Sequence, residues 1–358
     1  MNEKGCGIMI KEFGYEYDAV LNEDIWKETK GIVTDEKLFD AICLRSGRDA
    51  LKAVAREYEP CVTYLPALAC DSMVHPFEQY GHTIRFYNLK SDYSIDLSNL
   101  VFDTENSLFL YMDYFGRPSI NDDVLVRLRT NRNIVFIEDR THSLIWERNS
   151  TFQPDYIMAS LRKWIAIPDG GLLWGKISQP LNDDTSFSTT RLEAQCMRNN
   201  YLQHGDEALK KKFRKIFSSV SDIMDHDDPC AMSAYSYAIA KETKWDDIRS
   251  ARKANAETLI SILQTSPHIT FIQNKTALSD LYVAFMVANR DEVQNRLSEM
   301  GIFNTIIWPL TVEQRIVSRV AKNVEDNMLA APCDQRYTID DMEYIGLEMV
   351  RIIEDVNR

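Results

Sequence analysis

Three short stretches of the sequence carry side chains whose types and spacing could do chemistry. The first is LRSGRDAL at 44–51, where Ser46 and Gly47 stand between an apolar run and a strong helix pattern that opens at Arg48. The start of a helix offers unpaired N–H groups and a partial positive charge, and a glycine lets an anion approach the backbone. The stretch therefore predicts either an anion site or a serine that simply caps a helix.

The second stretch, IVFIEDRTHS at 134–143, is an apolar run that ends in Glu138 and Asp139 and is followed by His142. In an open parallel sheet, ligands bind beyond the carboxyl ends of the strands, so an acid at this point can face a ligand. The alternative is a carboxylate that caps the next helix. A lone histidine is more often a surface or core residue than a catalyst, and both interpretations stay open here.

The third stretch spans 155–174 and contains Ser160 at the end of an apolar run, Lys163 three residues later, and a glycine pair before the next apolar run. A lysine beside Trp164 and other apolar side chains can be partly desolvated. Desolvation lowers the pKa of an amine and makes it a usable nucleophile. The alternative is an ordinary solvated lysine in a loop.

Together the three stretches meet the different needs of one cofactor. Pyridoxal phosphate requires a cup for its phosphate, an acid at its pyridine nitrogen and a lysine for its aldehyde. The sequence presents these groups in the order Ser46 and Gly47, Asp139, then Lys163, which lies 24 residues after Asp139. The combination predicts a pyridoxal phosphate enzyme more strongly than any one stretch does. A nicotinamide enzyme is disfavoured because no G-x-G-x-x-G follows a strand-like run.

The elements that must position these residues alternate regularly in the first half of the chain. Several runs are apolar at successive positions, as in strands covered on both faces, and helix-period stretches lie between them. This alternation predicts an α/β fold with a mainly parallel, seven-stranded sheet between helices. The expected strands are 39–44, 61–65, 83–87, 106–112, 133–138, 155–160 and 171–174, and the expected helices are 48–58, 71–80 and 121–130.

The alternation of strand-like and helix-like runs gives way to long helical patterns after about residue 185. A length of 358 residues is sufficient for two domains. We expect a large cofactor-binding α/β domain at 1–185 and a smaller C-terminal α+β domain at 186–358, with roughly the first 30 residues free to pack on the smaller one. The elements expected in the second half are helices at 191–219 and 231–264, strands at 269–273 and 281–288, a helix near 290–300, a strand at 302–307 and a closing helix from Asp340.

Composition excludes several classes of partner. Forty-one Lys and Arg against fifty-four Asp and Glu give a net charge of −13, and such a field repels phosphate backbones and anionic lipids. We therefore expect no nucleic acid and no membrane as main partners. No run reaches the ~18 apolar residues of a spanning helix, and the first residues lack the features of a secretory signal. The seven cysteines are scattered without a C-x-x-C, which argues against a disulfide framework or a metal site and for a cytoplasmic protein.

The same stretches resemble the DegT/DnrJ/EryC1/StrS family of pyridoxal-phosphate-dependent sugar aminotransferases, which have the fold type I, aspartate aminotransferase-like architecture. SGRDAL resembles the family's SGTxAL, IEDRTH resembles IEDAAQ or IEDAAH, and SLRKWIAIPDGG resembles the lysine loop S-x-x-x-K followed by GEGG. The segments YFGRP at 114–118, WPL at 308–310 and APCDQRYTIDDMEYI at 331–345 also resemble family motifs. The resemblance spans nearly the whole chain and is looser between residues 175 and 300.

The resemblance implies a role for each matched residue. Lys163 corresponds to the lysine that holds pyridoxal 5'-phosphate as a covalent aldimine and then moves a proton between the substrate carbon and the cofactor. Asp139 corresponds to the acid that pairs with the pyridine N–H and keeps the ring an electron sink. These two are the catalytic residues that the resemblance implies. The other implied cofactor-binding residues are Ser46, Gly47, Arg48 and Ser160 at the phosphate, His142 beside the ring hydroxyl, and Cys70.

Three positions depart from the family pattern. The family places an aromatic side chain or a histidine over the cofactor ring, whereas the aligned position here is Cys70 or its neighbour Asp71. The family often reaches an asparagine of the partner subunit to the phosphate, and the corresponding segment here, 229–233, has the sequence PCAMS. Arg48 stands where the family usually has threonine. These departures leave the stacking group and the exact phosphate cup open.

The resemblance implies an aminotransferase that moves an amino group from L-glutamate to a keto group of a nucleotide-linked sugar, in surface polysaccharide or secondary-metabolite biosynthesis. It also implies a homodimer with active sites at the interface. The departures at Cys70 and Pro229 keep an alternative open, namely a pyridoxal-phosphate-binding sensor or scaffold of the same fold that does not transaminate. A lyase or dehydratase ranks lower, because dehydration in this family goes with a Lys-to-His change and Lys163 is intact.

Overall fold

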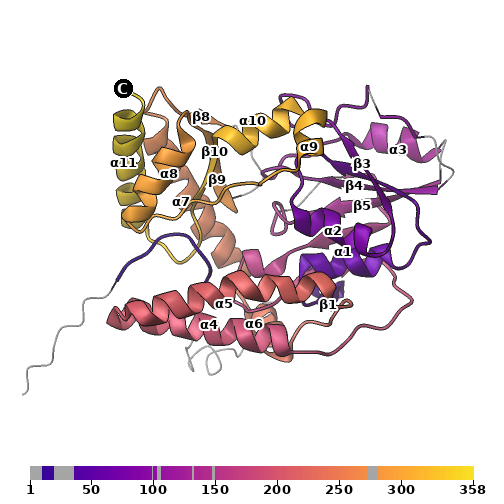
Figure 1. Ribbon diagram of the computed structural model, residues 1–358, viewed down its shortest axis with the longest axis horizontal. Helices are drawn as coiled ribbons and strands as arrows, with labels where there is room; N and C mark the ends of the chain where they lie inside the picture. The colour runs from indigo at the N-terminus through magenta and orange to yellow at the C-terminus, as the bar shows by residue number, and fades with distance from the viewer. Residues whose placement is uncertain are drawn as a thin grey trace, which may run out of the picture.

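The first half of the chain folds into a seven-stranded sheet flanked by helices (Figure 1). The computed structural model describes residues 10–19, 36–98, 100–102, 106–130, 133–146, 150–272 and 280–358. Strands β2 to β6 pair in parallel, and β7 runs antiparallel to both of its neighbours. In the order β1-β7-β6-β5-β4-β2-β3, the strands are β1 (Ile42–Leu44), β7 (Gly171–Trp174), β6 (Tyr156–Ala159), β5 (Asn133–Asp139), β4 (Asn106–Met112), β2 (Val62–Pro66) and β3 (Thr83–Tyr87).

The predicted strands are confirmed, and the direction of β7 has a simple cause. A parallel neighbour needs a crossover connection of a dozen or more residues, usually with a helix. Only residues 160–170 separate β6 from β7, and they contain a single 3-10 turn, η3 (Leu161–Lys163). The chain therefore returns antiparallel. The prediction was wrong for the start of the first strand, since residues 39 and 40 belong to the 3-10 turn η2 (Glu36–Asp40).

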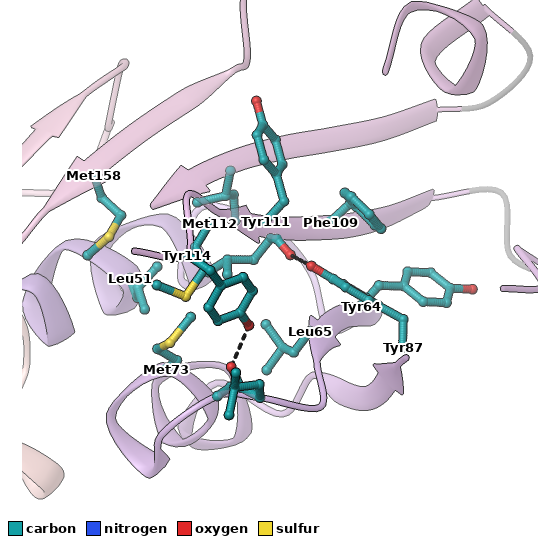
Figure 2. Close-up of a cluster of buried hydrophobic side chains, with 14 of the residues drawn as sticks. Leu51, Tyr64, Leu65, Met73, Tyr87, Phe109, Tyr111, Met112, Tyr114 and Met158 are labelled. Carbon is teal, nitrogen blue, oxygen red and sulfur yellow. Dashed lines mark hydrogen bonds between the residues drawn. The ribbon is translucent and has the colours of Figure 1, made fainter. Parts of the chain in front are cut away.

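Helices α1 (Gly47–Ala55), α2 (Asp71–Gln79) and α3 (Asp122–Thr130) lie close to the predicted ranges. The core between the sheet and α1 and α2 is rich in buried tyrosine and methionine (Figure 2). The hydroxyl of Tyr114 donates to the carbonyl of Leu68 at 2.5 Å, and that of Tyr87 donates to Leu110 at 2.9 Å. These bonds satisfy the polar ends of the rings and offset the cost of removing the hydroxyls from water.

Four helices follow where the sequence predicts two long ones. They are α4 (Ser186–His204), α5 (Glu207–His226), α6 (Ala234–Glu242) and α7 (Trp245–Leu263). Gly205 adopts a positive φ of 74° and ends α4, and Asp206 caps the start of α5 by accepting from the Ala208 N–H. The chain therefore doubles back, and α4 and α5 run side by side along the lower edge of Figure 1.

The last part of the chain builds a three-stranded antiparallel sheet in the order β10-β9-β8. The predicted strand at 302–307 is wrong, because Ile302 and Thr305 make only isolated bridges, to Phe13 and Ala330. Strand β10 and helices α9 and α10 were not predicted. The elements are β8 (Thr270–Phe271), β9 (Tyr282–Met286), α8 (Arg290–Glu299), α9 (Val312–Val317), α10 (Arg319–Asn327), β10 (Met328–Pro332) and α11 (Ile339–Val356).

The small sheet and helices α7, α8 and α11 share one hydrophobic core, which also includes Phe13. The Phe13 N–H donates to the Gly301 carbonyl at 2.8 Å, and the Gly14 N–H donates to the Tyr337 hydroxyl at 2.6 Å. Residues 10–19 thus lie against the C-terminal part, while 1–9 and 20–35 fall outside the described residues. The predicted domain boundary at 185 stays a prediction. No helix within the described ranges is long and apolar enough to cross a membrane.

Candidate active site

A pocket at the carboxyl ends of β4, β5 and β6 gathers all eight residues that the sequence predicts for cofactor binding. Its empty space is about 570 Å³ including the open mouth. The predicted residues that line it are Ser46, Gly47, Arg48, Cys70, Asp139, His142, Ser160 and Lys163. The sequence did not predict the other lining residues, which are Leu51, Ser72, Met73, Met112, Thr141, Met158, Arg162, Met224 and Trp308.

The N-terminus of α1 forms one wall of this pocket. The Ser46 hydroxyl accepts from the Asp49 N–H at 3.1 Å and donates to the Asp49 carboxylate at 2.7 Å, so it caps the helix as the structural alternative predicted. An α-helix cannot satisfy its first N–H groups from within, and α1 begins at Gly47. A Cβ on Gly47 would lie 3.4 Å from the Ser160 Cβ, which shows how closely this helix start approaches Ser160.

The glycine pair after the lysine is explained by this same wall. A Cβ on Gly171 would lie only 2.2 Å from the carbonyl carbon of Ser46 and 2.7 Å from the backbone nitrogen of Gly47. The N–H of Gly170 donates to the Arg45 carbonyl at 2.7 Å. Strand β7 therefore packs directly on the backbone where α1 begins, and only glycine leaves room for that approach.

The segment 229–233, which departs from the family pattern, has an internal role. Its Ser233 begins α6, and the Ser233 N–H and hydroxyl donate to the buried carboxylate of Asp169 at 2.8 and 2.6 Å. Asp169 directly precedes the glycine pair, so these bonds anchor the end of the lysine loop. Burial raises the pKa of Asp169, although the bonds from Ser233 and Ser236 partly oppose that rise.

Asp139 is the last residue of β5 and is only 4% exposed. Its Oδ1 accepts from the Thr141 N–H at 2.7 Å. Burial raises the pKa of Asp139, and the Thr141 hydrogen bond and the positive charge of Lys163 offset part of that rise. A cationic N–H placed against this carboxyl would favour its ionised form.

His142 is buried and neutral. Its Nδ1 accepts from the Phe115 N–H at 3.2 Å, so in the neutral ring the proton sits on Nε2. Burial first, and the charge of Lys163 second, lower the pKa of His142 to about 3. The indole of Trp308 lies 6.0 Å from the imidazole, tilted by 34°. His142 can therefore donate a hydrogen bond from Nε2 across the physiological pH range.

Lys163 ends the 3-10 turn η3, and its amine has no hydrogen-bond or ion-pair partner among the described residues. The next residue, Trp164, is held from four directions. Its indole N–H donates to the Thr141 carbonyl at 2.8 Å. Its own carbonyl accepts from Tyr17 at 3.2 Å, Arg252 at 3.2 Å and Gln335 at 2.9 Å. These bonds fix the backbone beside the lysine and leave its side chain free to act in the pocket.

Ser160 and Thr141 link the two strand ends. The Ser160 N–H donates to the Thr141 hydroxyl at 3.0 Å, while the Ser160 hydroxyl has no partner within the described residues and faces the pocket as a donor. Thr141 was missed at the sequence level, although a residue two places after a strand-end aspartate commonly donates its N–H to that carboxylate.

Cys70 lines the pocket just before α2, and its thiol contacts the Ser72 hydroxyl at 2.9 Å. No aromatic ring stands at this position, as the sequence comparison with the family motif indicated. Apolar surface comes instead from Trp308 and from the methionines, three of which, Met73, Met112 and Met158, lie together in Figure 2. Trp308 belongs to the WPL motif and could have been found there, whereas no sequence signal marks the methionines.

No protein-family profile and no curated protein matches the chain, but solved structures do. PseC of Helicobacter pylori, an aminotransferase involved in the biosynthesis of pseudoaminic acid, is 15% identical, with a TM-score of 0.64 over 96% of this chain and 100% of that one. A DegT DnrJ EryC1 StrS aminotransferase from Brucella abortus is 14% identical, with a TM-score of 0.58 over 94% and 91% of the chains. The E. coli GDP-4-keto-6-deoxy-D-mannose-3-dehydratase with bound hydrated pyridoxal phosphate is 16% identical, with a TM-score of 0.61 over 95% and 100%.

These matches extend over nearly the whole chain at low sequence identity, so they show its fold. The chain therefore has the fold type I architecture of the DegT/DnrJ/EryC1/StrS sugar aminotransferases, as its sequence motifs predicted.

Proposed function

We propose that this chain is a pyridoxal-phosphate-dependent aminotransferase acting on a nucleotide-linked sugar. The observation that supports the proposal is that predicted residues spread from 46 to 163 in the sequence line one pocket. These residues supply the different groups that this cofactor needs. Such a combination is less expected by chance than any one of the motifs.

The donor set fits the cofactor. Ser160 offers a hydroxyl, and the first N–H groups of α1, on Gly47 and Arg48, offer a helix N-terminus for a phosphate. Asp139 offers a carboxylate for the ring nitrogen, and His142 offers Nε2–H for the ring oxygen. Apolar contact for the ring comes from Trp308 and the methionines of the pocket. Lys163 offers an amine with no competing partner among the described residues.

Bound pyridoxal phosphate supplies an electron sink beside the reacting carbon and carries the amino group between two substrates. Lys163 would hold the cofactor covalently, and its amine would take and return a proton at the substrate carbon. Asp139 would keep a proton on the ring nitrogen, since a negative charge there raises the pKa of that nitrogen. A positioned proton transfer of this kind contributes roughly 10²- to 10⁴-fold to a rate.

The structural likeness to PseC, an aminotransferase involved in the biosynthesis of pseudoaminic acid, supports a proposal of particular substrates. We propose L-glutamate as amino donor and a keto group of a nucleotide-linked sugar as acceptor, in surface polysaccharide or secondary-metabolite biosynthesis. We also propose that the protein works as a cytoplasmic homodimer. Dehydration is disfavoured because Lys163 is present in the pocket.

The alternative is a protein that binds pyridoxal phosphate without transaminating, as a sensor or scaffold. Cys70 in place of a stacking aromatic, and the use of segment 229–233 as an internal anchor, favour it. The two functions differ in one observable, which is the half-reaction with an amino donor.

The proposal is tested with purified protein, pyridoxal phosphate and L-glutamate. We expect the visible absorbance of lysine-bound cofactor, which L-glutamate converts to the spectrum of the aminated cofactor with stoichiometric release of 2-oxoglutarate. After borohydride reduction, mass spectrometry should find the cofactor on the peptide that contains Lys163. Lys163→Ala should lose the covalent link and at least a 10³-fold share of the rate.

Lys176→Ala is the matched control, because Lys176 is exposed just after β7 and does not line the pocket. Covalent attachment that persists in Lys163→Ala contradicts the lysine assignment. Cofactor binding with no conversion by any amino donor favours the non-transaminating alternative instead.

A further inference from the structure

Arg162, the residue just before Lys163, lines the same pocket and was not predicted as a site residue. It is only partly buried as a whole, but its Nε is buried without a hydrogen-bond partner. Among the described residues its guanidinium makes no hydrogen bond and no ion pair; its backbone N–H alone is bonded, to the Gly170 carbonyl at 3.3 Å. Buried N–H groups of arginine side chains normally have hydrogen-bond acceptors. The guanidinium of Arg162 therefore has donors that the described residues do not use.

The surroundings of Arg162 make the absence of a partner costly. Burial lowers the pKa of Arg162 most, Arg191 and Arg48 lower it further, Glu16 raises it, and the net result is a pKa of about 10. The side chain therefore stays cationic at neutral pH. Arg48 is paired with Asp225, and Arg191 is paired with Glu16 at 2.7 Å. Both neighbouring arginines thus form an ion pair, whereas Arg162 forms none with the described residues and feels the charge of Glu16 only at longer range.

The two adjacent cations of the loop act on different charged or polar groups of the pocket. The positive charge of Lys163 lowers the pKa values of Asp139 and His142, so it acts on the end of the pocket that they form. Arg162 is grouped instead with Arg48, at the start of α1. A ligand with a negative group at this second end would compensate the cluster of positive charge.

We propose that Arg162 binds an oxyanion, a phosphate or carboxylate group, of the ligand in this pocket. A guanidinium with free Nε and Nη donors matches such a group in a two-pronged geometry that lysine cannot reproduce. This inference rests on the proposed function for the nature of the ligand. The oxyanion has two sources, the phosphate of pyridoxal phosphate or an anionic group of a substrate, and the experiment separates them.

The test compares wild type with Arg162→Gln and Arg162→Lys, and uses Arg319→Gln as control. Arg319 is exposed at the start of α10 and does not line the pocket, so its replacement makes the same change in net charge. Calorimetry measures dissociation constants for pyridoxal phosphate, for pyridoxal without phosphate and for inorganic pyrophosphate. Steady-state kinetics measure KM and kcat for L-glutamate and for a nucleotide sugar. Thermal unfolding checks that each variant folds.

If the oxyanion belongs to the cofactor, Arg162→Gln weakens pyridoxal phosphate binding about 10- to 100-fold and leaves pyridoxal unchanged. If it belongs to a substrate, cofactor affinity is unchanged and one KM rises by a similar factor with little change in kcat. In either case Arg162→Lys recovers only part of the loss. Equal behaviour of Arg162→Gln and Arg319→Gln toward every probe would overturn the proposal.

Failure of the proposed function gives a different pattern. Wild-type protein that binds no pyridoxal compound refutes the function, and the pyrophosphate measurement then decides on Arg162 alone. Weaker pyrophosphate binding by Arg162→Gln than by wild type supports the oxyanion site even then. Absence of pyrophosphate binding by such a wild type overturns it.

Discussion

At the scale of single residues, burial controls the charge of the groups around the pocket. His142 is 2% exposed and accepts a hydrogen bond from a backbone N–H at Nδ1. Protonation of the ring would create a charge away from water and break that bond. Asp139 is also buried, but the Thr141 N–H and the charge of Lys163 favour its ionised form. The pocket therefore holds a neutral hydrogen-bond donor, His142, close in sequence to a buried carboxyl group, Asp139, whose pKa depends on its neighbours.

The neutral state of His142 predicts a pH-dependent stability. Burial and Lys163 hold its pKa at about 3 in the folded protein, against 6.5 for an ordinary histidine. As the pH falls below about 6.5, the unfolded chain binds a proton that the folded protein refuses, so stability falls towards pH 3. At about 1.4 kcal/mol per pKa unit, the loss reaches a few kcal/mol at most.

Urea unfolding of the cofactor-free protein at pH 7, 5.5 and 4 measures this effect. We expect His142→Asn to lose less stability than wild type as the pH falls, so the difference in unfolding free energy between them narrows. His204→Asn is the control, because His204 is exposed at the end of α4. A difference that stays constant with pH, or widens in acid, contradicts the neutral assignment.

At the scale of elements, the pocket depends on how closely β7 meets the start of α1. The short link between β6 and β7 carries Ser160, Lys163 and the glycine pair, so one loop supplies the lysine and also the contact surface for the helix that begins at Gly47. The position of the first N–H groups of α1 relative to Ser160 is therefore set by backbone packing.

Gly171→Ala should disturb this packing. The added methyl group would meet backbone atoms of Ser46 within 2.3 Å, and backbone cannot move aside as a flexible side chain can. We expect a loss of about 1–3 kcal/mol in unfolding free energy. We also expect about a 10-fold or greater weakening of pyridoxal phosphate binding, because a shift of 1.4 kcal/mol at the phosphate is tenfold in affinity.

Fluorescence titration and urea unfolding measure the two effects of that substitution. Gly346→Ala is the control, since the atoms nearest to a Cβ there belong to the Ile262 side chain, at 3.0 and 3.1 Å, and Gly346 does not line the pocket. It should cost stability without changing cofactor affinity. Wild-type affinity in Gly171→Ala would show that the contact does not position the helix start.

At the scale of the whole molecule, a net charge of −13 coexists with a cationic pocket. Its described lining holds Arg48, Arg162 and Lys163 against the single carboxylate of Asp139. Local charges and helix N–H groups act at short range, whereas the distant acidic surface is screened by salt. The walls also come from both halves of the chain, since Trp308 belongs to the C-terminal half.

Cofactor binding should therefore stabilise the folded protein as a whole. Pyridoxal phosphate at one hundred times its dissociation constant should raise the unfolding free energy by about 2.7 kcal/mol, because the unfolded chain does not bind it. Differential scanning calorimetry with increasing cofactor measures the shift of the transition. Lys163→Ala should show a smaller shift at the same cofactor concentration. A cofactor that binds without moving the transition contradicts the placement of its site in this pocket.

Much of the site could be predicted because its key residues stand where apolar runs end. Asp139 ends β5, Ser160 directly follows β6, and Lys163 ends the short turn after it. The helix that starts at Gly47 was visible from its periodicity. Arg162 was missed because nothing local distinguishes an unpaired arginine from a paired one. The false strand at 302–307 arose because an apolar run makes a strand only when a neighbour pairs along its length, and here it has isolated bridges.

The hydrogen bonds on the Trp164 carbonyl have a consequence for the order of events during synthesis. Their donors, Tyr17, Arg252 and Gln335, are separated from Trp164 by 147, 88 and 171 residues, the first before it and the other two after it. The ribosome makes the chain from its N-terminus, at ≈ 5–20 residues per second. The sheet can assemble early, but the backbone beside Lys163 is not fully restrained until Gln335 has emerged. A nascent chain with a finished seven-stranded sheet therefore still lacks part of this restraint, which arrives only with the 171 residues that follow Trp164.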